Sequence, residues 1–410
     1  MELQALLSEA GRVNPYQLYA QLHSAGAASH LDVSKDGYDL AVFGYDAVNQ
    51  LLRDGRFRQL DADYLDVHSP RWREHPVLQT LRDSIFFTDG PEHARLRRLV
   101  GQLFTARRVA VMEPAITKLI HDRLDRIAQL GADGDTVDFM AEFAYAVPSC
   151  VIGDLLGVPE ADRGWMRPRV LAISAIFELD GSTWPNMTRA DAATRELTAY
   201  FAGLVAQRRL DPRDDLISDL ARLQAETPGV FSDAELIANL ITLFNAGFVT
   251  TTHLFGNGLA ILADRPELRD ELVESPERAP SYVEEILRVE PPAHFVVRYA
   301  SSAETVGGLP CDEGSTILVM LGAANRDPSI YAEPDVFDPS RFDAGGPVTP
   351  ILTFGAGGHY CLGAAMTRLE GAIAFPAIFE RFPGLHLATE PPPPTQLMFR
   401  GHDVLPIRLR

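Results

Sequence analysis

The chain has 410 residues, 46% of them hydrophobic, so it can bury a large core as one domain or two. Its formal net charge of −19 argues against nucleic acid or an anionic membrane as a partner. There is no apolar run of the roughly 20 residues that span a bilayer and no secretory signal, so we expect a soluble cytoplasmic protein. Cys150, Cys311 and Cys361 are odd in number and widely spaced, a pattern that fits neither a disulfide framework nor a zinc site.

Capping signals indicate where the main helices begin. Asp89 and Glu92 have the spacing of a capping box, and Pro91 suits the first turn of a helix. Ser232 and Glu235 have the same spacing and open a proline-free segment that continues to about residue 263. At 1.5 Å per residue this helix would be roughly 46 Å long, enough to cross a whole domain.

Two more helices and several strands are expected in the second half of the chain. One helix begins at Ser281, with Glu284 three residues later, and ends before Pro291; another follows Cys361 and continues to about Phe382. The strand candidates are residues 38–43, 296–306, 315–320, 385–389 and 404–409. We therefore predict a mainly α-helical protein with small β-sheets, forming a single domain over residues 1–410.

Residues 354–363, Phe-Gly-Ala-Gly-Gly-His-Tyr-Cys-Leu-Gly, place Cys361 between a glycine-rich turn and a helix. Gly355, Gly357 and Gly358 permit positive φ angles and a close approach of the backbone to a flat ligand. The helix that follows directs its N–H groups and positive dipole end at the sulfur, which favours the thiolate. A buried structural cysteine is the alternative, but ten consecutive positions fit one design. Zinc and iron–sulfur sites would need further cysteines nearby.

This ten-residue segment resembles the haem-ligand signature of the cytochrome P450 family without a mismatch, and the resemblance covers most of the chain. It implies the cytochrome P450 fold, with the long central helix over the haem and the thiolate loop before the last long helix. It further implies heme b (iron protoporphyrin IX) bound through Cys361, with Phe354 and Gly363 beside it. In this family the thiolate donates electron density to the iron and favours O–O cleavage.

The resemblance also assigns a structural cluster. Glu285 and Arg288 look like the family's Glu-x-x-Arg pair, and Arg341 looks like its third member. One helical turn places Glu285 and Arg288 on the same face, so a buried three-way cluster is feasible. An ordinary surface ion pair is the alternative. We expect the cluster to hold the segment that carries Cys361.

Four cationic side chains are expected to contact the haem propionates. His93 and Arg97 lie four residues apart on one helix face, which suits a shared carboxylate. The resemblance adds Arg298 and His359. For His93 the alternative is a solvated histidine in the first turn of a helix.

The long helix contains a segment, Ala246 to Thr251, that resembles the family's oxygen-activating sequence Ala/Gly-Gly-x-acid-Thr. The resemblance gives catalytic roles to Ala246, Gly247 and Thr250: Gly247 weakens the helix locally and Thr250 assists proton delivery. The acid that normally precedes the threonine is Val249, which cannot relay a proton. Three routes remain open: water held by Thr250, a substrate hydroxyl, or direct use of peroxide. His253, one turn on, is better interpreted as a satisfied helix histidine.

Thr242, Ala246 and Thr250 repeat every four residues and are expected to face the haem, with Asn245 adjacent to this stripe. Thr242 and Asn245 either orient a polar group of the substrate or satisfy a neighbouring segment, and the sequence favours neither. By resemblance the pocket also involves the 61–87 loop and the Phe177 region. Its other expected members are Phe87, His294, Phe295, Val296, Met398 and Phe399.

These features predict a soluble bacterial monooxygenase that inserts one oxygen atom of dioxygen into a small organic substrate such as a secondary metabolite. Electrons would come from ferredoxin and ferredoxin reductase, because no nucleotide fingerprint occurs in a strand–helix context. A basic stretch is expected to dock ferredoxin, with a generic solvated face as the rival interpretation; it comprises Arg95, Arg97, Arg98, Arg107 and Arg108. The alternatives are peroxide-driven or non-hydroxylating oxidative coupling, and a non-catalytic haem-thiolate sensor.

Overall fold

The computed structural model describes residues 3–32, 37–102, 104–178, 183–227, 229–343, 348–394 and 396–410. The chain divides into two compact units. The first unit comprises Met1–Phe57, Ala106–Val147 and Thr250–Arg410, and the second comprises Arg58–Thr105 and Pro148–Val249. The single domain over residues 1–410 stays a prediction.

The main sheet has five strands in the order β1 (Ala28–His30), β2 (Leu40–Val42), β8 (Thr316–Val319), β5 (Val296–Ala300) and β3 (Phe57–Arg58). The pairing of β2 with β8 is parallel, and β1 and β5 pair antiparallel with β2 and β8. All four residues of β8 are buried, and its Thr-Ile-Leu-Val sequence is rich in the β-branched side chains that suit a strand. The core beneath this sheet includes Val48 and Leu51 of α5 (Tyr45–Arg53).

The described residues form two smaller sheets besides the main sheet. One has the order β4 (Val137–Asp138), β10 (Pro406–Arg408) and β9 (His386–Leu387), and the other pairs β6 (Glu304–Val306) with β7 (Leu309–Cys311). Strands are therefore confirmed within all five predicted ranges, but residues 296–306 form two strands because β5 pairs with β8 and β6 pairs with β7. Sequence reasoning missed β1, β3, β4 and β7, which have only two or three residues each.

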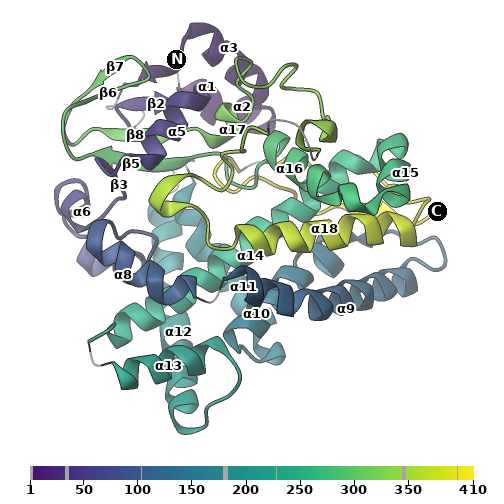
Figure 1. Ribbon diagram of the computed structural model, residues 1–410, viewed down its shortest axis with the longest axis horizontal. Helices are drawn as coiled ribbons and strands as arrows, with labels where there is room; N and C mark the ends of the chain where they lie inside the picture. The colour runs from purple at the N-terminus through teal and green to yellow at the C-terminus, as the bar shows by residue number, and fades with distance from the viewer. Residues whose placement is uncertain are drawn as a thin grey trace. The chain divides into compact units, whose positions relative to one another are not determined.

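The helices of the first unit surround the last long helix, α18 (Ala364–Arg381). It packs against α9 (Ala106–Leu130), α15 (Pro266–Glu274) and α16 (Ala279–Val289), and Figure 1 shows α18 and α9 side by side. The buried residues of α9 repeat every three or four positions, as a helix with one apolar face requires. The shorter helices of this unit are α1 (Leu3–Leu7), α2 (Glu9–Val13), α3 (Tyr16–Ala25) and α17 (Leu321–Ala324).

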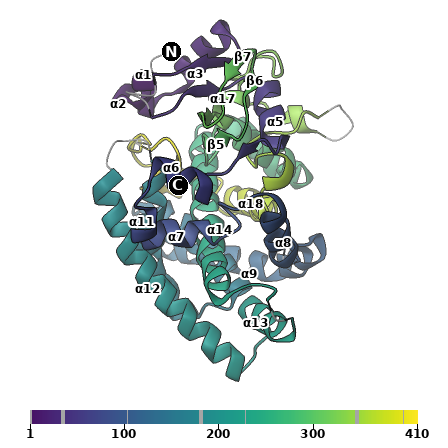
Figure 2. The same cartoon turned by 90° about the vertical axis from the view of Figure 1, so that its left-hand side faces the viewer.

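The second unit is built around α12 (Thr183–Leu210). This helix packs against α7 (Pro76–Arg82), α11 (Glu160–Ser174) and α13 (Leu216–Glu226), and Figure 2 shows its course beside α11. Other helices that contribute to this unit are α6 (Ala62–His68), α8 (Gly90–Gly101), most of α10 (Ala146–Leu156) and the part of α14 (Asp233–Ala263) up to Val249.

The long predicted helix is α14 (Asp233–Ala263), and its capping box is confirmed. The Glu235 N–H donates to Ser232 Oγ at 3.1 Å, and the Ser232 N–H donates to Glu235 Oε2 at 2.6 Å. By length and composition α14 could cross a membrane, which the expectation of no spanning segment did not anticipate. However, 61% of its most apolar window is buried, as in the core helix of a soluble protein.

The other two predicted capping boxes are wrong, although both helices exist. The Asp89 carboxylate accepts the N–H of Gln59 at 2.6 Å and is thereby committed to a distant segment. Helix α16 begins at Ala279, so Ser281 already lies inside it and donates to Phe342 O at 3.1 Å. The ends predicted for α16 and α18 agree with the structure to within a residue or two.

The structure brings Glu285, Arg288 and Arg341 together. Two guanidinium N–H groups of Arg288 donate to the two carboxylate oxygens of Glu285, each at 2.7 Å, and both side chains are fully buried. Arg341 Nε lies 3.5 Å from Glu285 Oε1 as an ion pair, and Arg341 also donates to Glu333 O at 3.1 Å. The remaining N–H groups of Arg288 donate to the carbonyl groups of Asn325, Pro334 and Val336.

Asn325 links this cluster to the segment before the thiolate loop. Its side-chain oxygen accepts the Leu352 N–H and its side-chain nitrogen donates to Thr353 Oγ1, both at 2.7 Å. The Thr353 hydroxyl in turn donates to Leu287 O at 2.7 Å. The buried ion pair thus holds Asn325, and Asn325 in turn holds the backbone that leads into residues 354–361.

We predict that Glu285→Ala lowers the free energy of unfolding by about 3–5 kcal/mol, because it leaves the Arg288 charge buried without its counter-ion. Guanidinium unfolding of the haem-loaded protein measures this loss. The exposed pair Arg71–Glu74 has the same i, i+3 spacing, so Glu74→Ala is the matched control and should leave the unfolding midpoint unchanged. Equal midpoints for Glu285→Ala and Glu74→Ala would contradict the structural role of the cluster.

Candidate functional site

The loop before Cys361 has the turn geometry that its glycines predicted. Gly355 has φ +69° and Gly357 has φ +68°, whereas Gly358 adopts no positive φ. The loop is closed by the Cys361 N–H, which donates to Phe354 O at 2.9 Å, and by the Gly355 N–H, which donates to Leu352 O at 2.8 Å. Helix α18 begins three residues after Cys361, so its first turn lies next to the thiol in sequence.

Cys361 differs from the other two cysteines in its environment. Its side chain is exposed, whereas Cys150 and Cys311 are buried, and burial raises the pKa of the Cys311 thiol. A Cβ placed on Gly363 would lie 3.9 Å from the Cys361 sulfur, so a side chain at this position would project over the thiol. Cys361 is therefore the cysteine whose sulfur a flat ligand can reach.

Arg368 stabilises the loop, and the sequence did not reveal this role. Its guanidinium carbon lies 4.4 Å from the centre of the Phe354 ring, which suits a cation–π contact. The same group donates to the Tyr360 hydroxyl at 2.9 Å and forms an ion pair with Glu284 of α16, one N–H donating to Glu284 Oε2 at 3.2 Å. Glu284, predicted as a capping residue, therefore helps to hold the loop.

The middle of α14 contains a short stretch that is less buried than the residues on either side of it. Ala246 is exposed, and Asn245, Gly247 and Thr250 are partly buried, while most of their neighbours are fully buried. This exposure fits a stripe that faces a bound cofactor. Thr242 is buried, and its hydroxyl has no hydrogen-bond partner among the described residues.

Two residues of this stripe also have contacts within the second unit. The Ser174 hydroxyl donates to Asn245 Oδ1 at 2.8 Å, which favours satisfaction of a neighbouring helix over orientation of a substrate. A Cβ on Gly247 would lie 3.0 Å from the Ile152 side chain, so Gly247 permits close packing of α14 on α10. The predicted local distortion is not observed, since α14 is helical without a break from Asp233 to Ala263.

The two predicted pocket segments of the first unit lie next to each other. Ala293 forms a β-bridge with Phe399, and the His294 N–H donates to Met398 O at 3.1 Å. Phe295 and Met398 are buried, whereas Val296 and Phe399 are partly exposed.

His294 is held inside the first unit. It is fully buried, with Nδ1 2.9 Å from the Tyr19 hydroxyl. Burial, aided by the charges of Arg400 and Arg326, lowers the pKa of His294, so its ring is neutral at neutral pH. His294 is therefore positioned to shape the segment that carries Phe295.

The predicted pocket residue of the second unit, Phe87, is buried in an aromatic cluster. Its ring centre lies 5.2 Å from that of Phe86 and 6.4 Å from that of Phe177. The Ile85 N–H donates to Asn239 Oδ1 at 3.0 Å, which ties this segment to α14. The sequence analysis did not identify Asn239. It could have been recognised as a polar residue within an apolar helix, three positions before Thr242.

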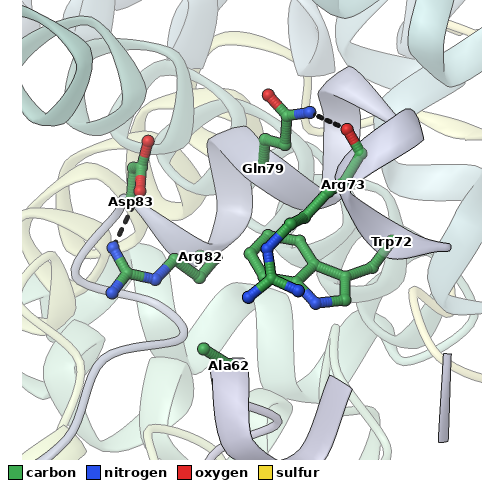
Figure 3. A pocket seen from close by; sticks show the side chains of 6 residues that line it. All are labelled: Ala62, Trp72, Arg73, Gln79, Arg82 and Asp83. Carbon is green, nitrogen blue, oxygen red and sulfur yellow. Dashed lines mark hydrogen bonds and ion pairs between the residues drawn. The ribbon is translucent and has the colours of Figure 1, made fainter. Parts of the chain in front are cut away.

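The 61–87 segment also surrounds a cavity of about 430 Å³, shown in Figure 3. The Arg73 guanidinium lies 4.4 Å over the Trp72 ring, and Arg82 pairs with Asp83 at 3.0 Å. Both arginines that line the cavity thus form ion pairs with neighbouring carboxylates: Arg73 with Asp66 and Arg82 with Asp83. The lining residues are Ala62, Trp72, Arg73, Gln79, Arg82 and Asp83.

The four candidate propionate partners are divided between the units. In the second unit, His93 is buried in the first turn of α8 and Arg97 is partly buried one turn later, so the solvated alternative for His93 is wrong. In the first unit, Arg298 is buried in β5 and donates to Val297 O at 2.7 Å, and His359 is partly buried in the thiolate loop. Contact of these residues with a propionate stays a prediction.

His253 does not behave as the satisfied helix histidine we expected. It is buried, and its Nδ1 has no hydrogen-bond partner among the residues the structure describes. Burial, with a smaller effect of His402, lowers the pKa of His253 to about 4. The ring is therefore neutral at neutral pH.

Cysteine ligation of haem fits the observations on the first unit: an exposed thiol, a glycine turn and an uncrowded Gly363. Across the described ranges, no group of three or more His, Cys, Asp or Glu side chains could hold a metal ion. Together, the mainly helical fold and the single-cysteine loop define a haem-thiolate protein.

Comparison with known proteins agrees with this class. The cytochrome P450 family model matches residues 57–403. A 6-deoxyerythronolide B hydroxylase from Saccharopolyspora erythraea is 34% identical and spans 98% of both chains. The structure of P450BioI bound to a fatty-acyl carrier protein has a TM-score of 0.87, 30% identity, and covers 98% of this chain and 100% of its own. The enzyme CxnD, described as forming a C–S bond in chuangxinmycin biosynthesis, has a TM-score of 0.84 and 32% identity over 97% of this chain and 94% of its own.

The chain belongs to the cytochrome P450 family and is a cytochrome P450 monooxygenase. The cofactor of this family is heme b with an axial cysteine thiolate.

We predict that Gly357→Ala destabilises the thiolate loop by about 1–3 kcal/mol, because alanine is strained at φ +68° and its Cβ would lie 2.6 Å from Leu52 O. Haem retention during guanidinium titration measures the effect. Gly358→Ala, with nothing within 4 Å of the added Cβ, is the neighbouring control. Indistinguishable haem retention in the two variants would contradict the required turn.

Removal of His253 should change the acid stability of the protein. Between pH 6.5 and about 4 the unfolded chain binds a proton at this histidine and the folded chain does not, so the parent loses stability as the pH falls through this window. His253→Gln should remove up to about 3 kcal/mol of that pH dependence, measured by unfolding at several pH values. His68→Gln, at an exposed histidine, is the control and should keep the parent's profile.

Proposed function

We propose that this monooxygenase inserts one oxygen atom of dioxygen into a small organic secondary metabolite, by hydroxylation or epoxidation, with electrons from ferredoxin and ferredoxin reductase. The observation that carries the proposal is the exposed Cys361 thiol in a closed glycine turn, within the same unit as Thr250. The relative named 6-deoxyerythronolide B hydroxylase supports a hydroxylation of this kind.

Each part of the chain would then have a defined task. The haem, bound through Cys361, supplies the redox chemistry that activates dioxygen. The closed loop and Arg368 keep the sulfur in one orientation. The Thr250 hydroxyl both donates and accepts hydrogen bonds, so it can hold a water and direct a proton. The apolar side chains of Phe295 and Val296 would exclude bulk water and receive an apolar substrate.

The ferredoxin would bind to exposed arginines at the start of α9, where Arg107 and Arg108 are exposed. Arg95 has a different role, because it forms an ion pair with Glu235 and donates to Val230 O at 2.6 Å. Exposed cations of this kind accelerate association with an acidic partner and lose effect in high salt. Such an electron supply fits a cytoplasmic location.

Oxidative coupling is the second candidate function. Val249 stands where the family's acid is expected, and the CxnD structure shows that this fold also serves C–S bond formation. Turnover with peroxide and none with ferredoxin would favour peroxide-driven chemistry. Binding of ligands without NAD(P)H consumption or peroxide turnover would favour a sensor.

The test is reconstitution of the haem-loaded protein with ferredoxin, ferredoxin reductase and a library of macrolide and peptide metabolites. We expect a red-shifted Soret band in the ferrous carbon monoxide complex and an oxygenated product whose new atom comes from labelled dioxygen. A Soret band without the thiolate shift in folded protein would overturn the haem-thiolate assignment. Product without label from dioxygen would overturn the monooxygenase reaction.

We predict that Val249→Glu raises the fraction of reducing equivalents that appear in product, because a carboxyl group at this position can relay protons. Product and peroxide yields per NAD(P)H measure the coupling. Val249→Gln is the matched control, since it introduces the same buried bulk without a titratable group. Equal coupling in the parent and Val249→Glu would contradict the role given to this position.

A further inference from the structure

Arg400 is a buried arginine that directly follows Phe399, one of the residues expected in the substrate pocket. Only 3% of Arg400 is exposed, although it lies outside the named helices and strands. An arginine is almost never buried in this way unless its charge is paired and its N–H groups find acceptors. The surroundings of Arg400 therefore show what its burial achieves.

The side chain of Arg400 is held by the N-terminal segment and by Glu290. Its guanidinium donates to Val13 O at 2.8 Å and also to Arg12 O, two carbonyl groups at the end of α2. Arg400 Nε donates to the Tyr16 hydroxyl oxygen at 3.4 Å and lies 3.7 Å from Glu290 Oε2. The Tyr16 hydroxyl in turn donates to Glu290, and burial raises the pKa of Tyr16, so the phenol keeps its proton. The guanidinium is thus fixed on the N-terminal helices.

Helix α14 holds the backbone of residues 400–401. The buried Asn257 side chain donates from Nδ2 to Arg400 O at 3.2 Å. Gly401 packs on the ring of the buried His253, one turn earlier in α14, since a Cβ on Gly401 would lie 2.5 Å from His253 Cγ. The same short segment is therefore anchored twice, through its side chain and through its backbone.

The anchored segment continues directly into the β-bridge that carries expected pocket residues. The Arg400 N–H donates to Pro292 O at 2.9 Å, and Phe399 forms the bridge with Ala293. Phe399 is partly exposed, whereas Met398 and Arg400 on either side of it are buried. Because one peptide unit separates Phe399 from Arg400, a displacement of the arginine is passed on to the aromatic ring.

We propose that Arg400 is a positioning residue that fixes Phe399 as a wall of the substrate pocket. This inference rests on the proposed function, in which the neighbouring segment with Phe295 receives an apolar substrate. An aromatic side chain that is already ordered loses little conformational entropy when a ligand packs against it. Arg400 therefore favours substrates with a rigid aromatic or apolar body, without touching them itself.

Two nitrogen ligands of ferric haem, imidazole and 4-phenylimidazole, test this role in the haem-loaded protein. Imidazole is too small to reach a pocket wall, whereas the phenyl ring of 4-phenylimidazole packs against one. In Arg400→Met the dissociation constant of 4-phenylimidazole should rise about threefold to tenfold, because the ligand must then order the wall itself. The dissociation constant of imidazole should stay the same. Shifts of the Soret band measure both constants.

Arg208→Met is the matched control for loss of a buried arginine. Arg208 is 2% exposed, pairs with Asp215 at 2.5 Å and donates to Gly157 O at 2.9 Å, all within the second unit. This variant should lose stability but keep the parent's ratio of the two dissociation constants. Asn257→Leu removes an α14 anchor without changing the Arg400 side chain, and it should also weaken 4-phenylimidazole binding. It keeps the test valid if Arg400→Met does not fold.

A double-mutant cycle separates positioning from a purely structural role. Phe399→Ala alone should weaken the binding of 4-phenylimidazole and leave that of imidazole unchanged. If Arg400 acts through Phe399, Arg400→Met should add no further loss in the Phe399→Ala background. A structural role of Arg400 would instead give losses that add.

The outcomes are distinct. An unchanged ratio of dissociation constants in Arg400→Met and Asn257→Leu, or additive losses in the cycle, overturns the inference while the proposed function stands. A parent whose Soret band does not respond to imidazole has no open iron position, which overturns the proposed function and with it the role of Arg400.

Discussion

The fully buried ion pair between Glu285 and Arg288 is the interaction on which the rest of the first unit depends. Two charges at zero exposure are tolerable only when every donor and acceptor is satisfied. Arg288 therefore binds three backbone carbonyl groups, and Glu285 accepts the Asp338 N–H at 2.7 Å. Through Asn325 this requirement reaches Leu352 and Thr353, so the segment entering the thiolate loop has little freedom.

Function in this enzyme depends on how a few polar groups are placed within an apolar interior. The loop presents one exposed sulfur, and α14 presents a short open stripe around Ala246. Val249, which is buried, stands where the family's proton-relaying acid is expected.

Local signals in the sequence predicted local features well. The glycines of the loop predicted the turns at Gly355 and Gly357, and Ser232 with Glu235 predicted the start of α14. The same kind of signal was wrong at Asp89, because its carboxylate found a backbone partner thirty residues away. Nothing in the nearby sequence distinguishes a cap from such a distant partner.

The supporting residues that could not be identified from the sequence also act through contacts between segments far apart in the chain. Arg368 acts on Phe354 and Glu284, and Asn239 acts on Ile85, through contacts that exist only once the fold has formed. The burial of His253 with a nitrogen left unsatisfied had no sequence signal either. The resemblance to the family predicted the reactive centre, whereas the contacts that support it could be identified only in the three-dimensional structure.

The neighbouring carboxylates of α16, Glu284 and Glu285, point to different sides of the helix. Glu284 pairs with Arg368 beside the loop, and Glu285 pairs with Arg288 in the core. Successive residues of a helix are about 100° apart, so a one-residue insertion before Glu284 would turn Glu284 away from Arg368 and turn the Glu285–Arg288 pair away from the backbone groups that it binds. Length variation among descendants of this chain should therefore accumulate in its surface connections and be absent from α16, whose helical register is itself under selection.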